Sequence, residues 1–289
     1  MTLRMSFWLG AALALLGTLS AFQLPFREFP GVEYRVGDIP MPGDALERTE
    51  WAFARLMYPP APRGRYGRGF GFRGGGVWTE GNSIWTQDYP RADRHFSLAV
   101  RRLTRIHVRS VEQPVNLDEG GEFDWPWLYA VQTGSWQLTD AQAKALREYL
   151  LRGGFLVTDD FWGPDPTQWE VFRETMDRVL PGHPITDIAL ADPVMHVLYD
   201  IEAKDLTWIP GTRHIRRGAG GGVAVQRPPG TSPAWRSLND DAGRMVVAVN
   251  YNTDIGDAWE YADSPMYPEA MTALAYRYGV NYLVYAMTH

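Results

Sequence analysis

Carboxylate and amide side chains follow two apolar segments of this sequence, and such groups suit the binding of a polar ligand. The apolar residues 155–157 run into Asp159 and Asp160, and the apolar run 245–249 is followed by Asn250, Asn252, Asp254 and Asp257. Neighbouring carboxylates repel unless they are protonated, hydrogen-bonded or bridged by a cation. A carboxylate pair can also supply a general acid and a general base, as it does in hydrolases.

Two tryptophans and one histidine complete the candidate set. Trp162 and Trp259 lie close in sequence to the two acidic segments, and indole rings beside carboxylates suit sugar rings or peptides. Packing beneath a loop is the alternative role for both. His196 can act as an acid or a base, and a structural role is its alternative. The candidate catalytic residues are therefore Asp159, Asp160, His196 and Asp254, and the candidate ligand-binding residues are Asp159, Asp160, Trp162, Asn250, Asn252, Asp254, Asp257 and Trp259.

Turn formation is the competing explanation for the acidic residues. Asp and Asn are favoured in turns and at helix starts because their side chains accept hydrogen bonds from free backbone N–H groups. Neither acidic segment matches a known metal-binding motif, so no residue is assigned as a metal ligand and no cofactor is identified. A divalent cation remains an alternative ligand, since hard cations prefer oxygen atoms.

The composition excludes several kinds of chemistry. The chain of 289 residues contains no cysteine, which rules out disulfides, thiolate metal sites and a cysteine nucleophile. No G-x-S-x-G elbow, P-loop or dinucleotide-binding fingerprint is present. The net charge of −6 does not favour nucleic acid, and the Gly/Arg-rich residues 61–76 are interpreted as a basic loop.

Strands and helices that alternate along the chain would position these residues. Apolar strands are predicted at 127–132, 155–160 and 244–250, and capped helices are predicted over 140–152 and 168–180. A further helix is predicted to follow Pro268, and another over 44–58, with Asp44 as its N-cap. This alternation predicts an α/β fold with a mainly parallel sheet. Ligands of such sheets bind beyond the carboxyl ends of the strands, where both acidic segments would lie.

The amino-terminal residues predict export. The apolar residues 5–22 follow Arg4 and have the length of a signal peptide, which is either cleaved or kept as an anchor. The expected organisation is a signal peptide or anchor over 1–24, then a linker, short helix and Gly/Arg-rich loop over 25–76, then an α/β domain over 77–289. We therefore expect a periplasmic or cell-envelope protein that meets the membrane only through its amino-terminal segment.

Several blocks of the sequence resemble a bacterial family, domain of unknown function 4159. They are "WTQDYPRADRHF", "LREYLLRGGFLVTDDFWG", "HVLYD" and "GRMVVAVNYNTDIGDAWE", within a resemblance that spans residues 84–289. The resemblance implies a flavodoxin-like, class I glutamine amidotransferase-like three-layer sandwich. Glutaminases of that superfamily use a cysteine at a strand-to-helix turn, and the similar turn here carries Thr158, Asp159 and Asp160. Thiolate acyl transfer is therefore impossible, and no catalytic residues can be carried over.

Three functional hypotheses follow from the sequence. The leading one is an exported or tethered protein that binds a small polar ligand, such as a sugar or cell-wall fragment, at the carboxyl edge of the sheet. The second is an envelope hydrolase that uses an Asp pair as acid and base. The third is a non-catalytic scaffold that contacts an envelope protein.

Overall fold

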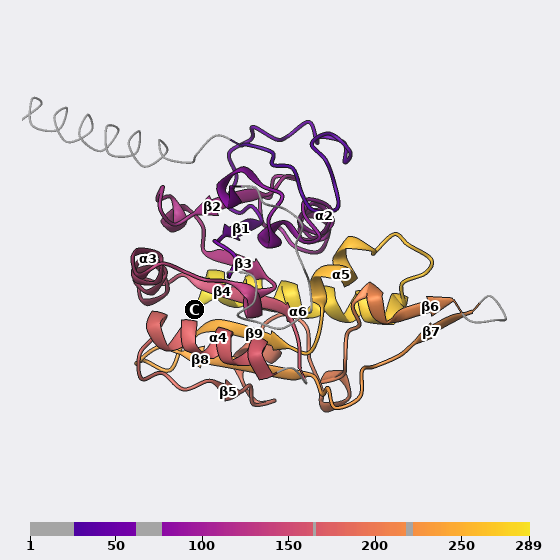
Figure 1. Ribbon diagram of the computed structural model, residues 1–289. Helices are drawn as coiled ribbons and strands as arrows, with labels where there is room; N and C mark the ends of the chain where they lie inside the picture. The colour runs from indigo at the N-terminus through magenta and orange to yellow at the C-terminus, as the bar shows by residue number, and fades with distance from the viewer. Residues whose placement is uncertain (1–25, 62–76, 164–165, 218–221) are drawn as a thin grey trace, which may run out of the picture.

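A seven-stranded, mostly parallel sheet forms the centre of the molecule (Figure 1). The computed structural model describes residues 26–61, 77–163, 166–217 and 222–289. The strand order is β2 (Gln113–Asn116), β1 (Ala54–Met57), β3 (Trp127–Val131), β4 (Phe155–Phe161), β9 (Met245–Tyr251), β8 (Ala234–Asn239) and β5 (Thr186–Asp187). Neighbouring strands from β2 to β9 pair in parallel, whereas β8 is antiparallel to both β9 and β5. A separate antiparallel hairpin pairs β6 (Ile215–Arg217) with β7 (Val223–Val225).

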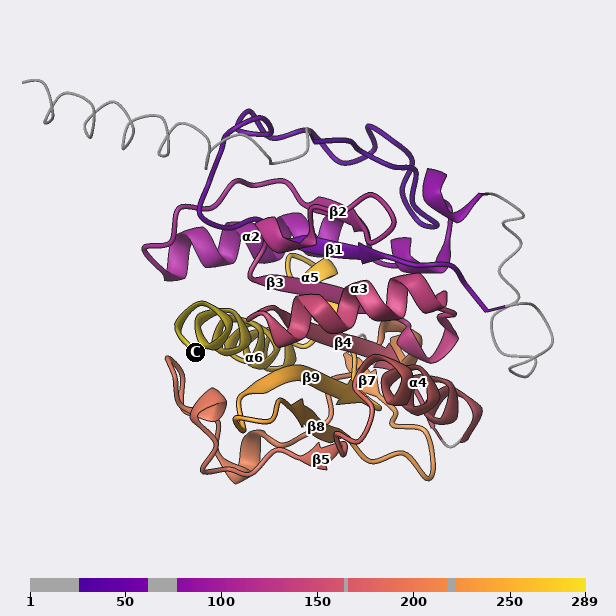
Figure 2. The same cartoon turned by 90° about the vertical axis from the view of Figure 1, so that its left-hand side faces the viewer.

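Helices cover both faces of the sheet (Figure 2). One face packs against α3 (Asp140–Leu151) and α4 (Pro166–Val179), and the other against α2 (Arg91–Leu103), α5 (Ile255–Glu260) and α6 (Glu269–Thr288). Short 3₁₀ helices occupy Trp78–Glu80, Ile84–Thr86, Glu122–Asp124, Thr133–Ser135, Pro193–Met195, Ala203–Asp205 and Thr212–His214. The predicted mixed α/β architecture with a mostly parallel sheet is confirmed.

The strands lack polar alternation because each has an apolar layer on both sides. Leu128 and Ala130 of β3 belong to the core shared with α3 and α4. Trp127, Tyr129 and Val131 of the same strand point the other way, into the core shared with α2 and α6. Successive strand residues face opposite sides, so a sheet buried on both faces needs apolar residues at every position.

The predicted capping box starts α3. The Thr139 hydroxyl accepts a hydrogen bond from the Gln142 backbone N–H at 3.1 Å, and the Gln142 side chain accepts one from the Thr139 N–H at 3.0 Å. After the helix, Gly153 adopts a positive φ of 111°. A Cβ on the next residue, Gly154, would lie 2.4 Å from the ring of Tyr149, so this turn into β4 requires glycine.

The predicted helix over 44–58 is wrong, because residues 54–57 form strand β1 between β2 and β3. Residues 51–58 are all buried, and a run without a polar face suits a sheet centre better than a surface helix. Asp44 caps no helix there; it accepts hydrogen bonds from Ser110 and pairs with Arg101. Part of the segment expected to be a linker is thus built into the sheet.

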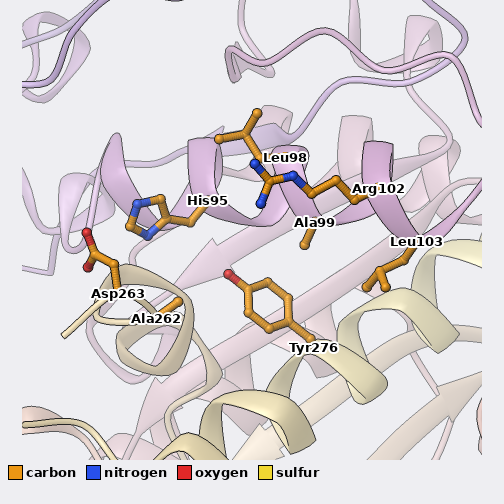
Figure 3. A pocket seen from close by; sticks show the side chains of 8 residues that line it. All are labelled: His95, Leu98, Ala99, Arg102, Leu103, Ala262, Asp263 and Tyr276. Atoms are coloured by element: carbon orange, nitrogen blue, oxygen red, sulfur yellow. The ribbon is translucent and has the colours of Figure 1, made fainter. Parts of the chain in front are cut away.

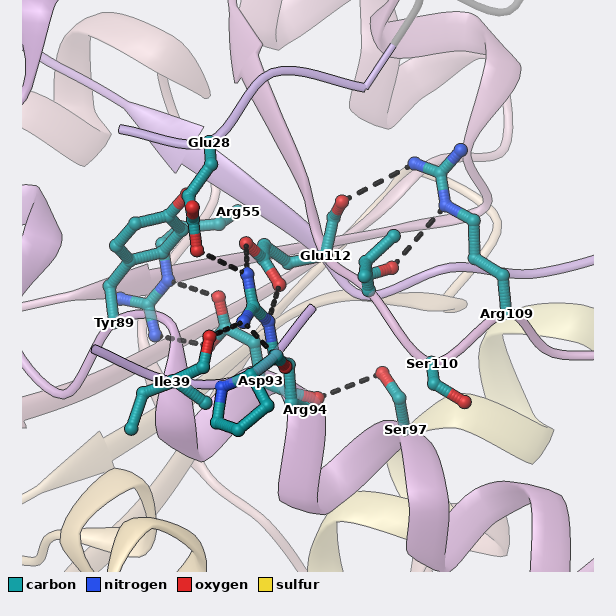
Figure 4. A network of polar contacts seen from close by, with 12 residues as sticks. Glu28, Ile39, Arg55, Tyr89, Asp93, Arg94, Ser97, Arg109, Ser110 and Glu112 are labelled. Carbon is teal, nitrogen blue, oxygen red and sulfur yellow. Dashed lines mark hydrogen bonds and ion pairs between the residues drawn. The ribbon is translucent and has the colours of Figure 1, made fainter. Parts of the chain in front are cut away.

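A network of buried ion pairs joins β1, α2 and the amino-terminal segment (Figure 4). Arg55 and Asp93 are both fully buried and form a bidentate pair, in which the Arg55 Nε lies 2.7 Å from a carboxylate oxygen. Arg55 also donates to the carbonyls of Trp85 and Gln87, which holds the loop before α2. Arg94 contacts Glu112 at 3.0 Å and Glu28 at 2.7 Å, and so ties the amino-terminal segment to α2.

Within the described ranges, no helix is both long and apolar enough to cross a bilayer. The leader predicted over residues 5–22 and the Gly/Arg-rich loop over 62–76 lie outside those ranges.

The Arg55–Asp93 pair predicts a large loss of stability when it is broken. Arg55→Met leaves the buried carboxylate of Asp93 without its partner, and we expect the free energy of unfolding to fall by about 3–5 kcal/mol. Urea denaturation measures this change. Arg173→Met is the matched control, because its pair with Asp177 is exposed and should change stability by about 0.5 kcal/mol or less. A loss below about 1 kcal/mol for Arg55→Met would contradict the assigned role.

Candidate functional site

The two predicted acidic segments meet at the carboxyl edge of the sheet. Strands β4 and β9 are parallel neighbours, so their carboxyl ends lie side by side. The Asp159 carboxylate, on β4, accepts hydrogen bonds from the backbone N–H of Gly256 at 2.9 Å and from the Tyr129 hydroxyl at 3.0 Å. Gly256 lies in the first turn of α5, directly after β9, so one contact joins the two acidic segments.

Helix α5 brings three further carboxylates into the same place. Asp254 is its N-cap and accepts from the Asp257 backbone N–H at 2.8 Å. The other oxygen of Asp254 and an oxygen of Asp257 lie 2.7 Å and 3.1 Å from the position that a Cβ on Gly211 would take. Asp257 accepts from Thr212, and Glu260 lies one turn further along the helix.

The loop before α2 and the amino-terminal segment supply the remaining acidic groups. Asp88 lies in that loop with a φ of +61°, and its backbone N–H donates to Glu33 at 2.9 Å. The hydroxyl of Tyr34 donates to Glu260. We call the whole set the acidic cluster: Glu33, Asp88, Asp159, Asp160, Asp254, Asp257 and Glu260.

Two triads within the acidic cluster have the proximity that a metal ion requires. In one, single carboxylate oxygens of Asp88, Asp254 and Asp257 lie within 4.8 Å of one another. In the other, the same holds for Glu33, Asp88 and Glu260. Carboxylate oxygens at this spacing can surround a hard divalent cation.

Burial makes it unfavourable for the carboxyls of the acidic cluster to be ionised. Apart from Glu33, which is exposed, its members are at most 7% exposed. Arg213 forms an ion pair with Asp160 at 3.0 Å and lies over the ring of Trp162. Within the acidic cluster, three buried carboxylate oxygens have no hydrogen-bond partner among the described residues: Asp88 Oδ2, Asp159 Oδ1 and Glu260 Oε2. Buried polar atoms without a partner are rare, because desolvation penalises them strongly.

The pKa values respond to this burial. Desolvation, with the charge of Asp160, raises the pKa of Asp159 to about 8. Desolvation, with the charge of Glu33, raises the pKa of Glu260 to about 9. Burial also raises the pKa values of Asp88 and Asp254 well above the ordinary range for Asp. His214, beside Trp162, has its pKa lowered to about 4 by burial and by Arg213, so its ring is neutral at pH 7.

The other sequence candidates take different positions. Trp162 borders the acidic cluster, and its indole N–H donates to Asp160. Trp259 is fully buried and packs on Phe96 in the core, so it presents no stacking surface to solvent.

The two asparagines and the histidine make structural contacts. Asn250 is buried and accepts from the Tyr282 hydroxyl, whereas Asn252 joins Gly163 to the Ser232 carbonyl. His196 is exposed and contacts Asp200 and the Leu190 carbonyl. The structure thus unites Asp159, Asp160, Trp162, Asp254 and Asp257 and leaves His196 outside the acidic cluster.

The candidate residues chosen from the sequence do not include Glu33, Asp88 or Glu260. The spacing of Asp254, Asp257 and Glu260 at every third residue would have indicated one helical face if the turn after β9 had been read as a helix. Asp88 and Glu33 have no comparable local signal, because tertiary contacts bring them to the site.

A family model for domain of unknown function 4159 matches residues 76–287. The chain belongs to this family. No curated protein matches it. Six members of the acidic cluster lie in the region matched to domain of unknown function 4159, whereas Glu33 and Tyr34 precede it.

A separate pocket of about 420 Å³ lies between α2 and α6 (Figure 3). His95, Arg102 and Asp263 line it together with Leu98, Leu103 and Tyr276. The ring of His95 is held by the Trp259 carbonyl at 2.8 Å. This pocket contains no member of the acidic cluster, and it combines apolar side chains with opposite charges.

The raised pKa values predict that the protein loses stability as the pH rises. The folded-state pKa values of Asp159 and Glu260, about 8 and about 9, exceed the ordinary values of 3.8 and 4.5. The stabilisation from these neutral carboxyls is complete below about pH 4 and is lost as the pH rises through the folded-state values. We expect a decrease of up to about 1.4 kcal/mol per pH unit for each group.

Urea denaturation between pH 5 and pH 9, without added ligand, measures this slope. Asp159→Asn and Glu260→Gln should each flatten it, because the amides do not titrate. Asp263→Asn is the control, since its exposed carboxylate has a lowered pKa and is ionised throughout this range. Stability that stays constant or rises with pH would rule out neutral carboxyls in the acidic cluster.

Proposed function

We propose that this protein binds a small, positively charged polar ligand at the acidic cluster. The carrying observation is the convergence of six buried carboxylates, three of which have an oxygen without a hydrogen-bond partner among the described residues. A cationic ligand would relieve the repulsion that otherwise keeps these groups protonated. A neutral sugar would leave that repulsion in place. The carboxylates therefore favour positively charged ligands over neutral polar ones.

We also propose that the fold is flavodoxin-like and resembles class I glutamine amidotransferases. The support is the order of the five parallel strands, β2-β1-β3-β4-β9, which corresponds to the order 2-1-3-4-5 of flavodoxin-like sheets. Asp159 and Asp160 lie near the carboxyl end of β4, and Asp254, Asp257 and Glu260 follow β9, at the edge where ligands of such sheets bind. With Thr158, Asp159 and Asp160 at the end of β4 and no cysteine in the chain, the proposed function is binding rather than acyl transfer.

The proposed setting is the cell envelope. The support is the apolar run over residues 5–22, which has the character of a signal peptide or anchor. In that setting, metal ions and amine-bearing cell-wall fragments are the cationic ligands within reach. The scaffold hypothesis stays a prediction, with an envelope protein as its partner.

The hydrolase alternative receives less support from the geometry. Asp159 and Asp254 lie near each other, but both accept hydrogen bonds from the first turn of α5 and both are at most 1% exposed. A hydrolytic pair needs room for a substrate and a water molecule between its carboxyls. The hydrolase alternative therefore stays a prediction, and it requires that the carboxyl edge of the sheet open to admit a substrate and a water molecule.

A thermal-shift screen of the full chain tests the proposed function. The panel holds Mg²⁺, Ca²⁺, Mn²⁺, spermidine and glucosamine, with glucose and N-acetylglucosamine as neutral counterparts. At about 100 times its Kd, a ligand specific for the folded state adds about 2.7 kcal/mol of stability and so raises the Tm. We expect cationic members to raise the Tm and neutral members to leave it unchanged.

Two variants locate the effect. Asp254→Asn should need at least ten times more ligand to reach the same Tm shift. The variant should still fold normally, because the amide oxygen can still cap α5. Asp263→Asn, on an exposed carboxylate outside the acidic cluster, should respond like the unmodified chain. Shifts from the neutral sugars alone, or no shift from any cation, would overturn the proposal.

A further inference from the structure

Asp88 belongs to both carboxylate triads of the acidic cluster, and this sharing suggests a specific ligand arrangement. We propose that Asp88 bridges two divalent cations, one held with Asp254 and Asp257 and the other with Glu33 and Glu260. The inference rests on the proposed function and deepens it by naming hard divalent cations as the ligand class.

The spacing of the oxygens fits this assignment. In each triad the three carboxylate oxygens lie within 4.8 Å of one another. Oxygen ligands lie 2.0–2.1 Å from Mg²⁺ and 2.3–2.6 Å from Ca²⁺, so opposite ligands around one ion are separated by roughly 4–5 Å. Carboxylates that bridge two ions about 3.5–4 Å apart are a recurrent arrangement in two-metal sites.

Unpartnered oxygens provide the second line of support. Asp159 belongs to neither triad, is fully buried, and has its Oδ1 without a partner among the described residues. Its other oxygen lies 3.5 Å from the position of a Cβ on Gly256, and that position is 2.5 Å from the unpartnered Oδ2 of Asp88 and 2.6 Å from the Tyr129 hydroxyl. The carboxylates of Asp159 and Asp88 therefore approach each other at Gly256, and only a residue without a side chain leaves room for both there.

Once bound cations displace their protons, the carboxylates of the acidic cluster carry more negative charge than one divalent ion balances. Seven carboxylates converge, and Arg213 pairs with Asp160. One divalent ion would leave much of the remaining negative charge uncompensated, whereas two ions supply four positive charges. Low-dielectric surroundings make this compensation important, because charges interact more strongly there than in water.

The two sites differ in their access to solvent. Glu33 is the exposed member of the acidic cluster, and its carboxylate already accepts hydrogen bonds from Gln87 and from the Asp88 N–H. Asp254 and Asp257 lie deeper, at the start of α5. The site of Glu33 and Glu260 is thus the outer one, and the site of Asp254 and Asp257 is the inner one.

Equilibrium dialysis of the full chain against Mn²⁺ at physiological ionic strength tests the arrangement. We expect two Mn²⁺ per unmodified chain. Asp254→Asn should remove the inner ion and Glu260→Gln the outer one, which leaves one Mn²⁺ in each variant. Asp88→Asn should weaken both sites at least tenfold, and Asp263→Asn should keep two. Circular dichroism confirms that each variant is folded.

Electron paramagnetic resonance of the unmodified chain tests the Asp88 bridge without any substitution. Two Mn²⁺ ions bridged by Asp88 should give an exchange-coupled electron paramagnetic resonance spectrum, whereas isolated ions give a six-line spectrum. One bound ion, an uncoupled spectrum, or two ions retained by Asp88→Asn at unchanged affinity would overturn the bridge. Binding of spermidine or glucosamine without any binding of metal would also overturn it, yet would leave the proposed function intact. If neither class binds, both proposals fail.

Discussion

The structure depends on how it accommodates several carboxylates buried side by side at one edge of the sheet. Like charges in a low-dielectric interior repel strongly, so each group requires a donor, a proton or a cation. The first turn of α5 supplies N–H groups to Asp159 and Asp254, Thr212 donates to Asp257, and Tyr34 donates to Glu260. Three oxygens of the acidic cluster are left without a donor among the described residues. This lack of donors makes the site suited to a proton or a cation.

The amino-terminal segment is part of this arrangement rather than a spacer. Glu33 belongs to the acidic cluster and Tyr34 donates a hydrogen bond to it, although both residues precede the region that matches the family. Arg94 holds the same segment through Glu28 and the carbonyl of Ile39, and Arg55 fixes the loop that carries Asp88. The ion pairs of β1 and α2 therefore position both the segment and the loop that complete the site.

Three residues near the acidic cluster have an unusual backbone conformation. Asp88, Asp160 and Asn252 adopt positive φ angles of 61°, 51° and 59°, which residues other than glycine rarely adopt. Asp and Asn tolerate this conformation better than most residues, and rare conformations tend to collect at functional sites. Three such residues lie near the ends of strands or in the adjoining loop. This agrees with a site in which the direction of the side chains outweighs the conformational cost of a positive φ.

The sequence by itself determined the central α/β architecture. Continuous apolar runs became β3, β4 and β9, and the Thr139–Gln142 box started α3, because hydrophobic periodicity and capping act over a few residues. It also indicated that Asp159, Asp160, Asp254 and Asp257 gather at one edge, since parallel neighbours end together.

Only the tertiary structure decided the rest. It made residues 54–57 an internal strand of the sheet, because burial on both faces outweighed the helical signals around them. It removed Trp259 and His196 from the site, and it added Glu33, Asp88 and Glu260. These residues are far apart in the chain or depend on loop conformation, and local patterns carry no information on which distant groups share one buried space.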